Sequence, residues 1–243
     1  MRDIRALVPA GRPLAVFLDY DGTLVGIRER PELARLGPRR RAELGRLSRK
    51  VKVAIVSGRP LADIRRLVGV PGLAYIGNHG LEIRAGGRTW VHPAAARRAG
   101  SVARAVEALR ARTSGLRGVL VEDKGLTASV HFRLAEARLL RPLRKIVAEE
   151  VRRSRGGLVL SRGKMVLEIR PNVPWDKGRG VLELMRRAGD AGSRFPIYIG
   201  DDRTDEDAFH ALGDRGLTIR VGTGRRTAAR HRLRSVEDVW KLL

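Results

Sequence analysis

The sequence has no cysteine, only 4% aromatic residues, and 26 acidic against 50 basic side chains. The lack of cysteine excludes disulfide bonds and thiolate catalysis, and it fits a reducing compartment. No apolar run approaches the length of a membrane span, and the N-terminal residues lack the apolar stretch of a secretory signal. We therefore expect a soluble, cytoplasmic protein with no membrane partner.

The excess of positive charge comes mainly from arginine, because only 7 of the 50 basic residues are lysine. The arginines are scattered through every segment, and the few aromatic rings offer no platform on which nucleic-acid bases could stack. We interpret the charge as a solvated surface that steers anionic substrates toward the protein, and we do not expect nucleic acid as a partner. With 243 residues, the chain is long enough for one large domain or two small ones, and we expect a monomer.

The most informative stretch is residues 16–23, where an apolar run ends at two aspartates separated by one residue. Residues 14–18 are typical of a strand that is buried on both faces of a parallel sheet. Asp19 and Asp21 then point to the same side at the carboxyl end of the strand, where open α/β sheets bind ligands. Carboxylates this close repel each other unless a cation relieves them, and magnesium (Mg2+) prefers such oxygen ligands. The alternative is that this pair and Gly22 form only a turn.

Two later strands are predicted to end at polar residues of the same kind. Residues 51–56 predict a strand that ends at Ser57 and Gly58, just before a helix, so Ser57 and nearby backbone N–H groups can bind an anion. An ordinary loop is the alternative at this position. Residues 195–199 predict a strand that ends at Asp201 and Asp202.

The turn after this last strand contains a second possible signal. Thr204 and Asp207 have the spacing of a capping box, although aspartate replaces the usual glutamate or glutamine. One or both of these residues may therefore serve only to begin the following helix. Asp201 and Asp202 precede the cap, which leaves them available to a metal.

The middle of the chain has a different sequence pattern: its predicted strands are short and alternate between apolar and polar residues, whereas the other strands are mostly apolar. The elements predicted there are a hairpin at 81–84 and 89–92, helices at 94–112 and 135–154, and strands at 118–123, 126–133, 158–161 and 164–170. Around this block, we predict strands at 73–76 and 217–221 and helices at 61–68, 179–188, 235–243 and 31–50, the last with a second helical piece that starts at Gly37-Pro38. The sequence thus predicts an α/β fold: a Rossmann-like parallel-sheet core, residues 1–79 and 172–243, and an inserted smaller α/β domain, residues 80–171.

Together, three strand ends carry an aspartate pair, Ser57-Gly58 and a second aspartate pair, and Lys177 stands at the head of a helix. These are the groups that phosphoryl transfer requires. One carboxylate can attack phosphorus, a second carboxyl can protonate the leaving oxygen, and a divalent cation can offset negative charge. Serine, lysine and backbone amides can hold the remaining phosphoryl oxygens.

The ordered motifs DYDGTL, SGR, DKG and GDDRTD resemble those of the haloacid-dehalogenase-like (HAD) phosphatases. Four further segments, GNHG, VEDKGLTASVHFR, KMVLEIRP and YIGDDRTDEDAF, are similar to the trehalose-6-phosphate phosphatases. The resemblance implies a HAD core with an inserted cap domain that sets substrate specificity. It also implies a magnesium-dependent phosphatase that converts trehalose 6-phosphate to trehalose and phosphate, the last step of trehalose biosynthesis.

Two alternatives stay open at this point. Related HAD phosphatases act on other sugar phosphates, such as sucrose phosphate or mannosylglycerate phosphate, with the same core chemistry. A basic nucleic-acid-binding protein with a vestigial phosphatase site is the other alternative, and the intact set of motifs argues against it.

Carried over to this sequence, the resemblance makes Asp19 the nucleophile that forms an aspartyl-phosphate and Asp21 the general acid and base. Ser57, Gly58 and Lys177 would hold the phosphoryl group. The metal ligands would be Asp19, the backbone carbonyl of Asp21 and Asp201, with Asp202 and Asp205 in or near the outer shell. The positions that would face the sugar are Glu122, Lys124, Arg133, Lys164 and Glu168. Without the resemblance, such alternating charges are better explained by the solvent-exposed face of a strand.

Overall fold

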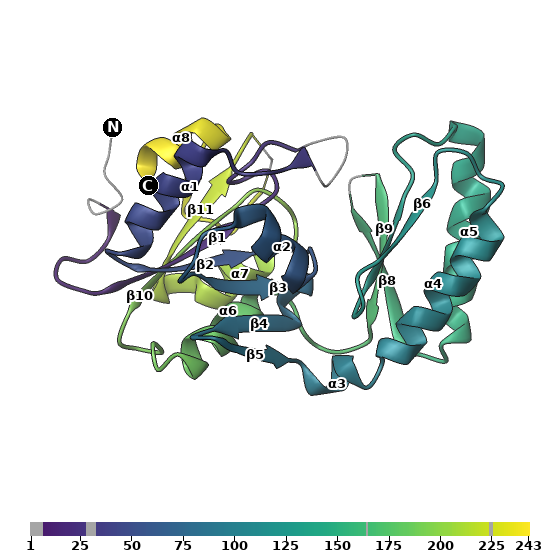
Figure 1. Cartoon of the computed structure of the whole chain (residues 1–243), viewed down its shortest axis with the longest axis horizontal. Coiled ribbons are helices and arrows are strands. Elements are labelled where there is room, and N and C mark those ends of the chain that lie inside the picture. Colours follow the sequence, from purple (N-terminus) through teal and green to yellow (C-terminus); the bar gives the residue numbers. More distant parts are fainter. Residues whose placement is uncertain (1–6, 28–32, 164, 224–225) are drawn as a thin grey trace. The chain divides into compact units, whose positions relative to one another are not determined.

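The computed structural model describes residues 7–27, 33–163, 165–223 and 226–243, and the chain forms two compact units (Figure 1). Met1–Trp90 and Trp175–Leu243 form the core unit, and Val91–Pro174 form the inserted unit. Both units combine helices with strands, and the larger sheet is mostly parallel. These features confirm the predicted class of an α/β core with a smaller α/β insertion.

The core unit is built on an eight-stranded sheet with the strand order β12-β11-β10-β1-β2-β3-β4-β5. Its strands are β1 (Leu14–Asp19), β2 (Lys52–Val56), β3 (Ala74–Gly77), β4 (Glu82–Ala85), β5 (Arg88–Val91), β10 (Phe195–Gly200), β11 (Leu217–Val221) and β12 (His231–Leu233). β1 lies inside the sheet and pairs in parallel with both β10 and β2. The carboxyl ends of these three strands therefore lie along the same edge of the sheet.

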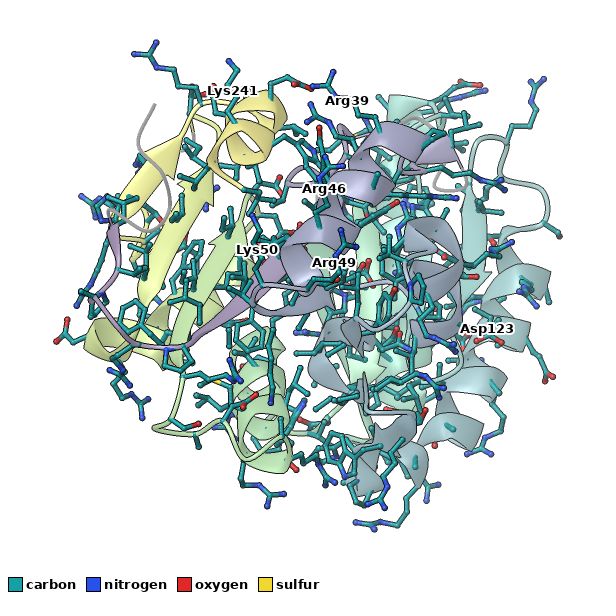
Figure 2. The ribbon with its side chains drawn as sticks, turned by 60° about the vertical axis from the view of Figure 1, so that its left-hand side comes forward. Arg39, Arg46, Arg49, Lys50, Asp123 and Lys241 are labelled. Atoms are coloured by element: carbon teal, nitrogen blue, oxygen red, sulfur yellow. The ribbon has the colours of Figure 1, made fainter. Side chains whose placement is uncertain are left out.

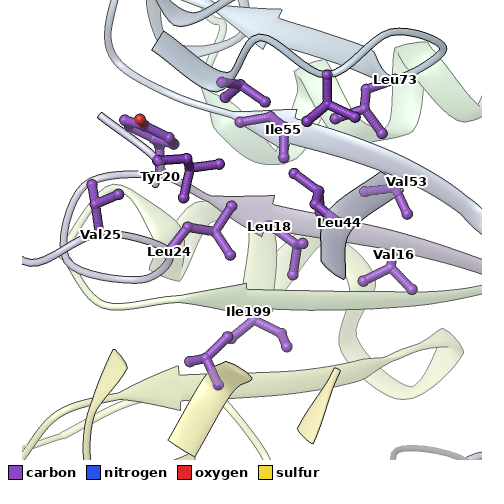
Figure 3. Close-up of a cluster of buried hydrophobic side chains, with 14 of the residues drawn as sticks. Val16, Leu18, Tyr20, Leu24, Val25, Leu44, Val53, Ile55, Leu73 and Ile199 are labelled. Carbon is purple, nitrogen blue, oxygen red and sulfur yellow. The ribbon is translucent and has the colours of Figure 1, made fainter. Parts of the chain in front are cut away.

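Helices cover both faces of this sheet. The core helices are α1 (Pro38–Ser48), α2 (Leu61–Val68), α6 (Lys177–Arg187), α7 (Asp205–Leu212) and α8 (Val236–Leu242). Apolar side chains of α1, α2 and α8 form one buried cluster with the sheet, and those of α6 and α7 form another on the opposite face. Figure 3 shows part of the first cluster, in which Leu18, Leu44 and Ile55 lie close together.

The alternation along β1 explains its continuous apolar sequence. Val16 and Leu18 belong to the first cluster, whereas Ala15 and Phe17 belong to the second. Fully burying one side chain of the size of leucine or phenylalanine stabilises a fold by about 1.5–3 kcal/mol. β1 is thus anchored from both sides, and the position of its last residue, Asp19, is fixed.

The hairpin β4–β5 belongs to the core sheet, because β4 pairs antiparallel with β3. The predicted core range 1–79 and insertion range 80–171 assign this hairpin to the inserted domain, whereas the units divide between Trp90 and Val91 and between Pro174 and Trp175. The difference has a simple cause. An antiparallel hairpin has the same alternating pattern whichever sheet it extends.

Several other elements also differ from the prediction. Of the helix expected over 31–50, the second piece begins at Pro38 as expected, whereas residues 34–37 before it are not helical and residues 28–32 lie outside the described part of the chain. The helix expected over 94–112 is divided into α3 (Pro93–Ala96) and α4 (Ala99–Thr113). β12, which has only three residues, was not predicted because it is too short to show a period.

The inserted unit has a four-stranded antiparallel sheet with the order β6-β7-β9-β8. Its elements after α4 are β6 (Leu120–Asp123), β7 (Ala128–His131), α5 (Leu140–Arg153), β8 (Leu158–Gly163) and β9 (Val166–Pro171). Val121, Val130 and Leu167 pack with α4 and α5 on one face of this sheet. Residues at alternate positions, including Glu122 and Glu168, therefore lie on the other face.

Many arginines lie on the surface of the core unit. Arg39, Arg46, Arg49 and Lys50 are exposed and project from α1 and the residues after it (Figure 2). Several surface arginines also pair with a glutamate three or four positions away in the same helix, as Arg39 does with Glu43. This arrangement agrees with a solvated basic surface. In the described ranges, no helix is both long and apolar enough to cross a bilayer.

Candidate active site

A buried ion pair lies at the carboxyl end of β1. Asp19, 4% exposed, is the last residue of β1, and Lys177, 3% exposed, is the first residue of α6. The Lys177 ammonium donates to Asp19 Oδ1 at 2.8 Å and to Asp205 Oδ1 at 2.8 Å. α6 begins at Lys177 because the Asp176 carboxylate accepts a hydrogen bond from the N–H of Arg179, as an N-cap does. The local sequence therefore fixes where this lysine enters the site.

The Asp205 carboxylate holds several groups of the site in place. It is fully buried, and its Oδ1 accepts from the Tyr198 hydroxyl at 2.7 Å as well as from Lys177. Its Oδ2 accepts from the backbone N–H groups of Asp201 and Asp202, both at 2.9 Å. One carboxylate thus ties the lysine, strand β10 and the turn after β10 together.

Thr204 is the N-cap residue of α7, as the capping-box spacing suggested, but its side chain does not form the cap hydrogen bond. Its hydroxyl donates instead to Asp202 Oδ1 at 2.7 Å. The Asp202 carboxylate also accepts from the Thr204 N–H. The turn is therefore stabilised by the carboxylates of Asp202 and Asp205, which accept hydrogen bonds from other residues of the turn. The capping spacing does not predict these bonds.

Three carboxylates form a group that could hold a metal ion. One oxygen each of Asp19, Asp201 and Asp205 lies within 4.8 Å of the others. A carboxylate has about four lone-pair sites, and the four donors to Asp205 occupy that capacity. Asp19 and Asp201 are therefore the side chains with the capacity to coordinate a cation. The carboxylate of Asp202, which was expected in or near the outer shell of the metal, accepts a hydrogen bond from the Thr204 hydroxyl.

The electrostatics of this group favour a bound cation. Burial, followed by the charge of Asp205, raises the pKa of Asp19 well above its usual range, although Lys177 acts to lower it. Burial and the charges of Asp205 and Asp202 raise the pKa of Asp201 to about 7. Burial lowers the pKa of Lys177, but Asp19 and Asp205 outweigh burial and raise it well above its usual value. One ammonium does not offset all the negative charge here, and a divalent cation would relieve the rest.

Asp21 has a separate partner. Arg59 donates from Nε to Asp21 Oδ2 and from Nη2 to Asp21 Oδ1, both at 2.7 Å. This bidentate contact holds a carboxylate that is 36% exposed. Arg59 was not predicted as a site residue, although it is the arginine of the SGR motif that provided Ser57.

Two glycines permit close approach at the site. Gly22 has φ +92°, and a Cβ there would lie 2.2 Å from an oxygen of Asp201, so no other residue fits beside that carboxylate. A Cβ on Gly58 would lie 2.5 Å from the ring of His79. Ser57 itself is buried, and its hydroxyl oxygen accepts from the N–H of Arg59 at 3.1 Å. The loop after β2 therefore lies beside the ring of His79.

Three of the five residues predicted to face the sugar lie together in the inserted unit. The Lys124 ammonium lies 4.0 Å from Glu122 Oε2 and 3.5 Å from Glu168 Oε1. Two residues that were not predicted join them: Ser129 donates to the Glu168 carboxylate at 2.9 Å, and His131 Nε2 lies 2.8 Å from Glu122 Oε2. Arg133 is exposed after the end of β7, and Lys164 lies outside the described residues.

A mostly parallel sheet with aspartates at the carboxyl ends of β1 and β10, and with an inserted α/β unit, is the fold of the HAD-like hydrolases. A haloacid dehalogenase-like hydrolase from Bacteroides thetaiotaomicron shares this fold, with a TM-score of 0.66 at 17% identity over 96% of this chain and 100% of that chain. Within this class, the chain belongs to the trehalose-phosphatase family, whose profile matches residues 17–237. The family expected from the motifs is thereby confirmed.

Individual relatives agree with this assignment. A trehalose-phosphate phosphatase of Mycobacterium bovis is 40% identical over 215 residues, which cover 86% of this chain and 54% of the relative. The crystal structure of a trehalose-6-phosphate phosphatase related protein superposes with a TM-score of 0.84 at 30% identity, covering 94% of both chains. The chain thus spans about half the length of the curated relatives it matches.

Proposed function

We propose that the chain hydrolyses trehalose 6-phosphate to trehalose and phosphate, in a magnesium-dependent reaction that passes through an aspartyl-phosphate. The observation that supports this most directly is the buried Asp19–Lys177 pair at the end of β1. A carboxylate buried with a lysine ammonium and beside Ser57-Gly58 provides both a nucleophile and a binding place for the phosphoryl oxygens. Membership of the trehalose-phosphatase family supports the choice of sugar.

In the first step, an oxygen of Asp19 attacks phosphorus, and the bond between phosphorus and the sugar oxygen breaks. Lys177 bonds to Oδ1, which fixes the orientation of the carboxylate for this attack. Asp21 gives its proton to the departing sugar oxygen, and it later takes a proton from the water that cleaves the aspartyl-phosphate. Arg59 fixes the place of the Asp21 carboxyl in the free protein.

The metal in this proposal is Mg2+, held by Asp19, Asp201 and the backbone carbonyl of Asp21. The oxygen-only donor set and the unrelieved negative charge of the cluster fit a hard divalent cation. When bound, such an ion offsets the charge of the phosphoryl oxygens. Asp202 and Asp205 then act as outer groups that shape the turn.

The raised pKa of Asp201 predicts an unusual pH dependence of stability. Because the folded pKa of about 7 exceeds the unfolded value, the folded state binds more protons between the two, and the free energy of unfolding falls as pH rises through this window. The loss is at most about 4 kcal/mol at pH 8. Mg2+ binds the ionised form, so it should stabilise the protein more at about pH 8 than at about pH 5.5.

Thermal unfolding with chelator and with Mg2+, at several pH values, measures this effect. Asp201→Asn should reduce the pH dependence, to which the raised pKa of Asp19 also contributes, whereas Asp63→Asn, which changes a partly exposed aspartate paired with Arg66, should preserve it. Equal stability at both pH values in chelator, or an equal gain from Mg2+ at both, would contradict the prediction.

The proposed activity is tested by phosphate release from a panel of trehalose, sucrose, glucose and mannosylglycerate phosphates, with Mg2+ or with chelator. We expect release to be fastest by far with trehalose 6-phosphate and to vanish in chelator. Equal turnover of all four sugars would preserve the core chemistry but refute the assignment of the substrate. No release from any of them, in Mg2+, would refute the function.

A further inference from the structure

Five polar side chains form a cluster on one face of the inserted unit's sheet, and we call it the sheet-face cluster. Its members are Glu122, Lys124, Ser129, His131 and Glu168. The strand register aligns Glu122 with Ser129 and Ser129 with Glu168, so three neighbouring strands each contribute one residue to a single row. His131 lies two residues beyond Ser129 on β7 and thus on the same face.

We propose that His131 and Ser129 are positioning residues that hold Glu122 and Glu168 in the orientations in which they accept hydrogen bonds from the sugar of the substrate. This inference rests on the proposed function, which makes the substrate a sugar phosphate. Neither residue needs to touch the reacting phosphorus. Their effect is on how well the sugar is recognised.

The contacts of His131 support this role. His131 Nε2 lies 2.8 Å from Glu122 Oε2, and the two side chains are 31% and 28% exposed. The pair therefore lies at a surface that a ligand can reach, rather than in the apolar core beneath it. A carboxylate has about four lone-pair sites, so one bond to His131 fixes the rotamer of Glu122 without using its whole capacity.

Ser129 acts on the other carboxylate. It is fully buried at the centre of the row, and its hydroxyl lies 2.9 Å from both oxygens of Glu168. The Lys124 ammonium, on a side chain only 8% exposed, lies within 4.0 Å of both carboxylates and lowers the cost of placing their charges side by side. Neither glutamate then has to be ordered when the sugar binds, and ordering a glutamate costs about 1.5–2 kcal/mol.

The choice of donors distinguishes this cluster from the structural glutamates of the chain. Glu43, Glu150 and Glu183 each pair with two arginines. In such pairs, two guanidinium groups donate to one carboxylate and occupy its lone pairs. In a chain so rich in arginine, the neutral hydroxyl of Ser129 and the ring of His131 are weaker partners. They orient a carboxylate and leave it able to accept from hydroxyl groups.

The test compares steady-state kinetics of His131→Phe and His131→Gln with two substrates, trehalose 6-phosphate and p-nitrophenyl phosphate. Phenylalanine retains the ring volume without the nitrogen, so KM for trehalose 6-phosphate should rise about tenfold while kcat changes little. Glutamine places an amide nitrogen near the position of Nε2 and should restore KM to within about twofold. KM and kcat for p-nitrophenyl phosphate, which has no sugar, should not change. Ser129→Ala should raise the sugar KM about fivefold.

Glu107→Gln, which removes an exposed carboxylate on α4 of the same unit, is the matched control and should leave both substrates unaffected. An unchanged sugar KM in His131→Phe would overturn the inference. So would an equal loss with both substrates, or a glutamine variant as impaired as the phenylalanine variant. If the wild type prefers another sugar phosphate, the proposed function fails. The KM of His131→Phe relative to that of the wild type, measured with the preferred sugar phosphate, then tests the inference. A wild type that binds no sugar phosphate better than p-nitrophenyl phosphate overturns both.

Discussion

Asp19→Asn is expected to lower turnover by a factor of at least ~10⁴ and, at about pH 8 without metal, to make the protein more stable than the wild type. The loss of turnover follows because an amide is not a nucleophile toward phosphorus. The gain in stability follows because burial and the charge of Asp205 raise the pKa of Asp19 despite the nearby ammonium of Lys177. A carboxyl whose pKa is raised on folding lowers the free energy of unfolding at pH values above its unfolded pKa, and the asparagine removes this cost.

Two measurements on the same preparations check this pair of effects: phosphate release with Mg2+, and thermal unfolding in chelator. A gain of 1 kcal/mol corresponds to a rise in melting temperature of about 2–4 °C for a chain of this size. Asp190→Asn is the matched control, because Asp190 is also buried but is paired with two cations, Lys52 and Arg194. That variant should be less stable than the wild type. An Asp19→Asn protein with a lower melting temperature, or with more than about 0.01% of wild-type turnover, would contradict the prediction.

The strands that carry the site could be predicted because their environment leaves a clear local pattern. β1 and β10 are buried on both faces, so almost every residue is apolar and each run stops where the polar residues begin. The hairpin β4–β5 shows the limit of this reasoning. Its alternation is local, but the choice between extending the core sheet and belonging to the insertion depends on its pairing with β3.

The site was predicted where its members carry the family motifs, and missed where a contact joins residues far apart in sequence. Asp21 and Arg59 are 38 residues apart, and no periodicity links them. The available signal was the position of Arg59 in the SGR motif, beside a serine that was predicted. His131 likewise stands within the segment VEDKGLTASVHFR, but it is paired with Leu120 in the strand register, and only the structure shows its diagonal contact with Glu122.

Asp205 was underestimated for a different reason. Its place at the end of GDDRTD indicated a residue in or near the outer shell of a metal. The structure shows that it accepts from Lys177, from Tyr198 and from two backbone N–H groups. Sequence can show that a carboxylate is near a site, but the number of donors that converge on it is decided by the packing of α6 against α7 and β10.

Asp205→Asn is expected to be the most destabilising conservative substitution in the site, because an amide cannot replace a carboxylate that accepts four hydrogen bonds. The Asp205 oxygens face donors on both sides, Lys177 and Tyr198 at Oδ1 and two backbone N–H groups at Oδ2. Whichever way the asparagine turns, its NH2 group opposes one of these pairs. Two buried donors then lose their acceptor, at about 1–3 kcal/mol each, so we expect a loss of about 3–5 kcal/mol in the free energy of unfolding.

Denaturant unfolding with Tyr198→Phe as the matched control measures this loss. The phenylalanine removes only one of the four donors, so it should cost about 1 kcal/mol. Turnover should also fall more in Asp205→Asn than in Tyr198→Phe, because Asp205 holds both Lys177 and the turn that carries Asp201. We expect Asp205→Asn to lose at least about 100-fold in turnover. If the asparagine variant unfolds at the same denaturant concentration as the wild type, Asp205 does not organise the site, and the anchoring of Lys177 must come from Asp19 alone.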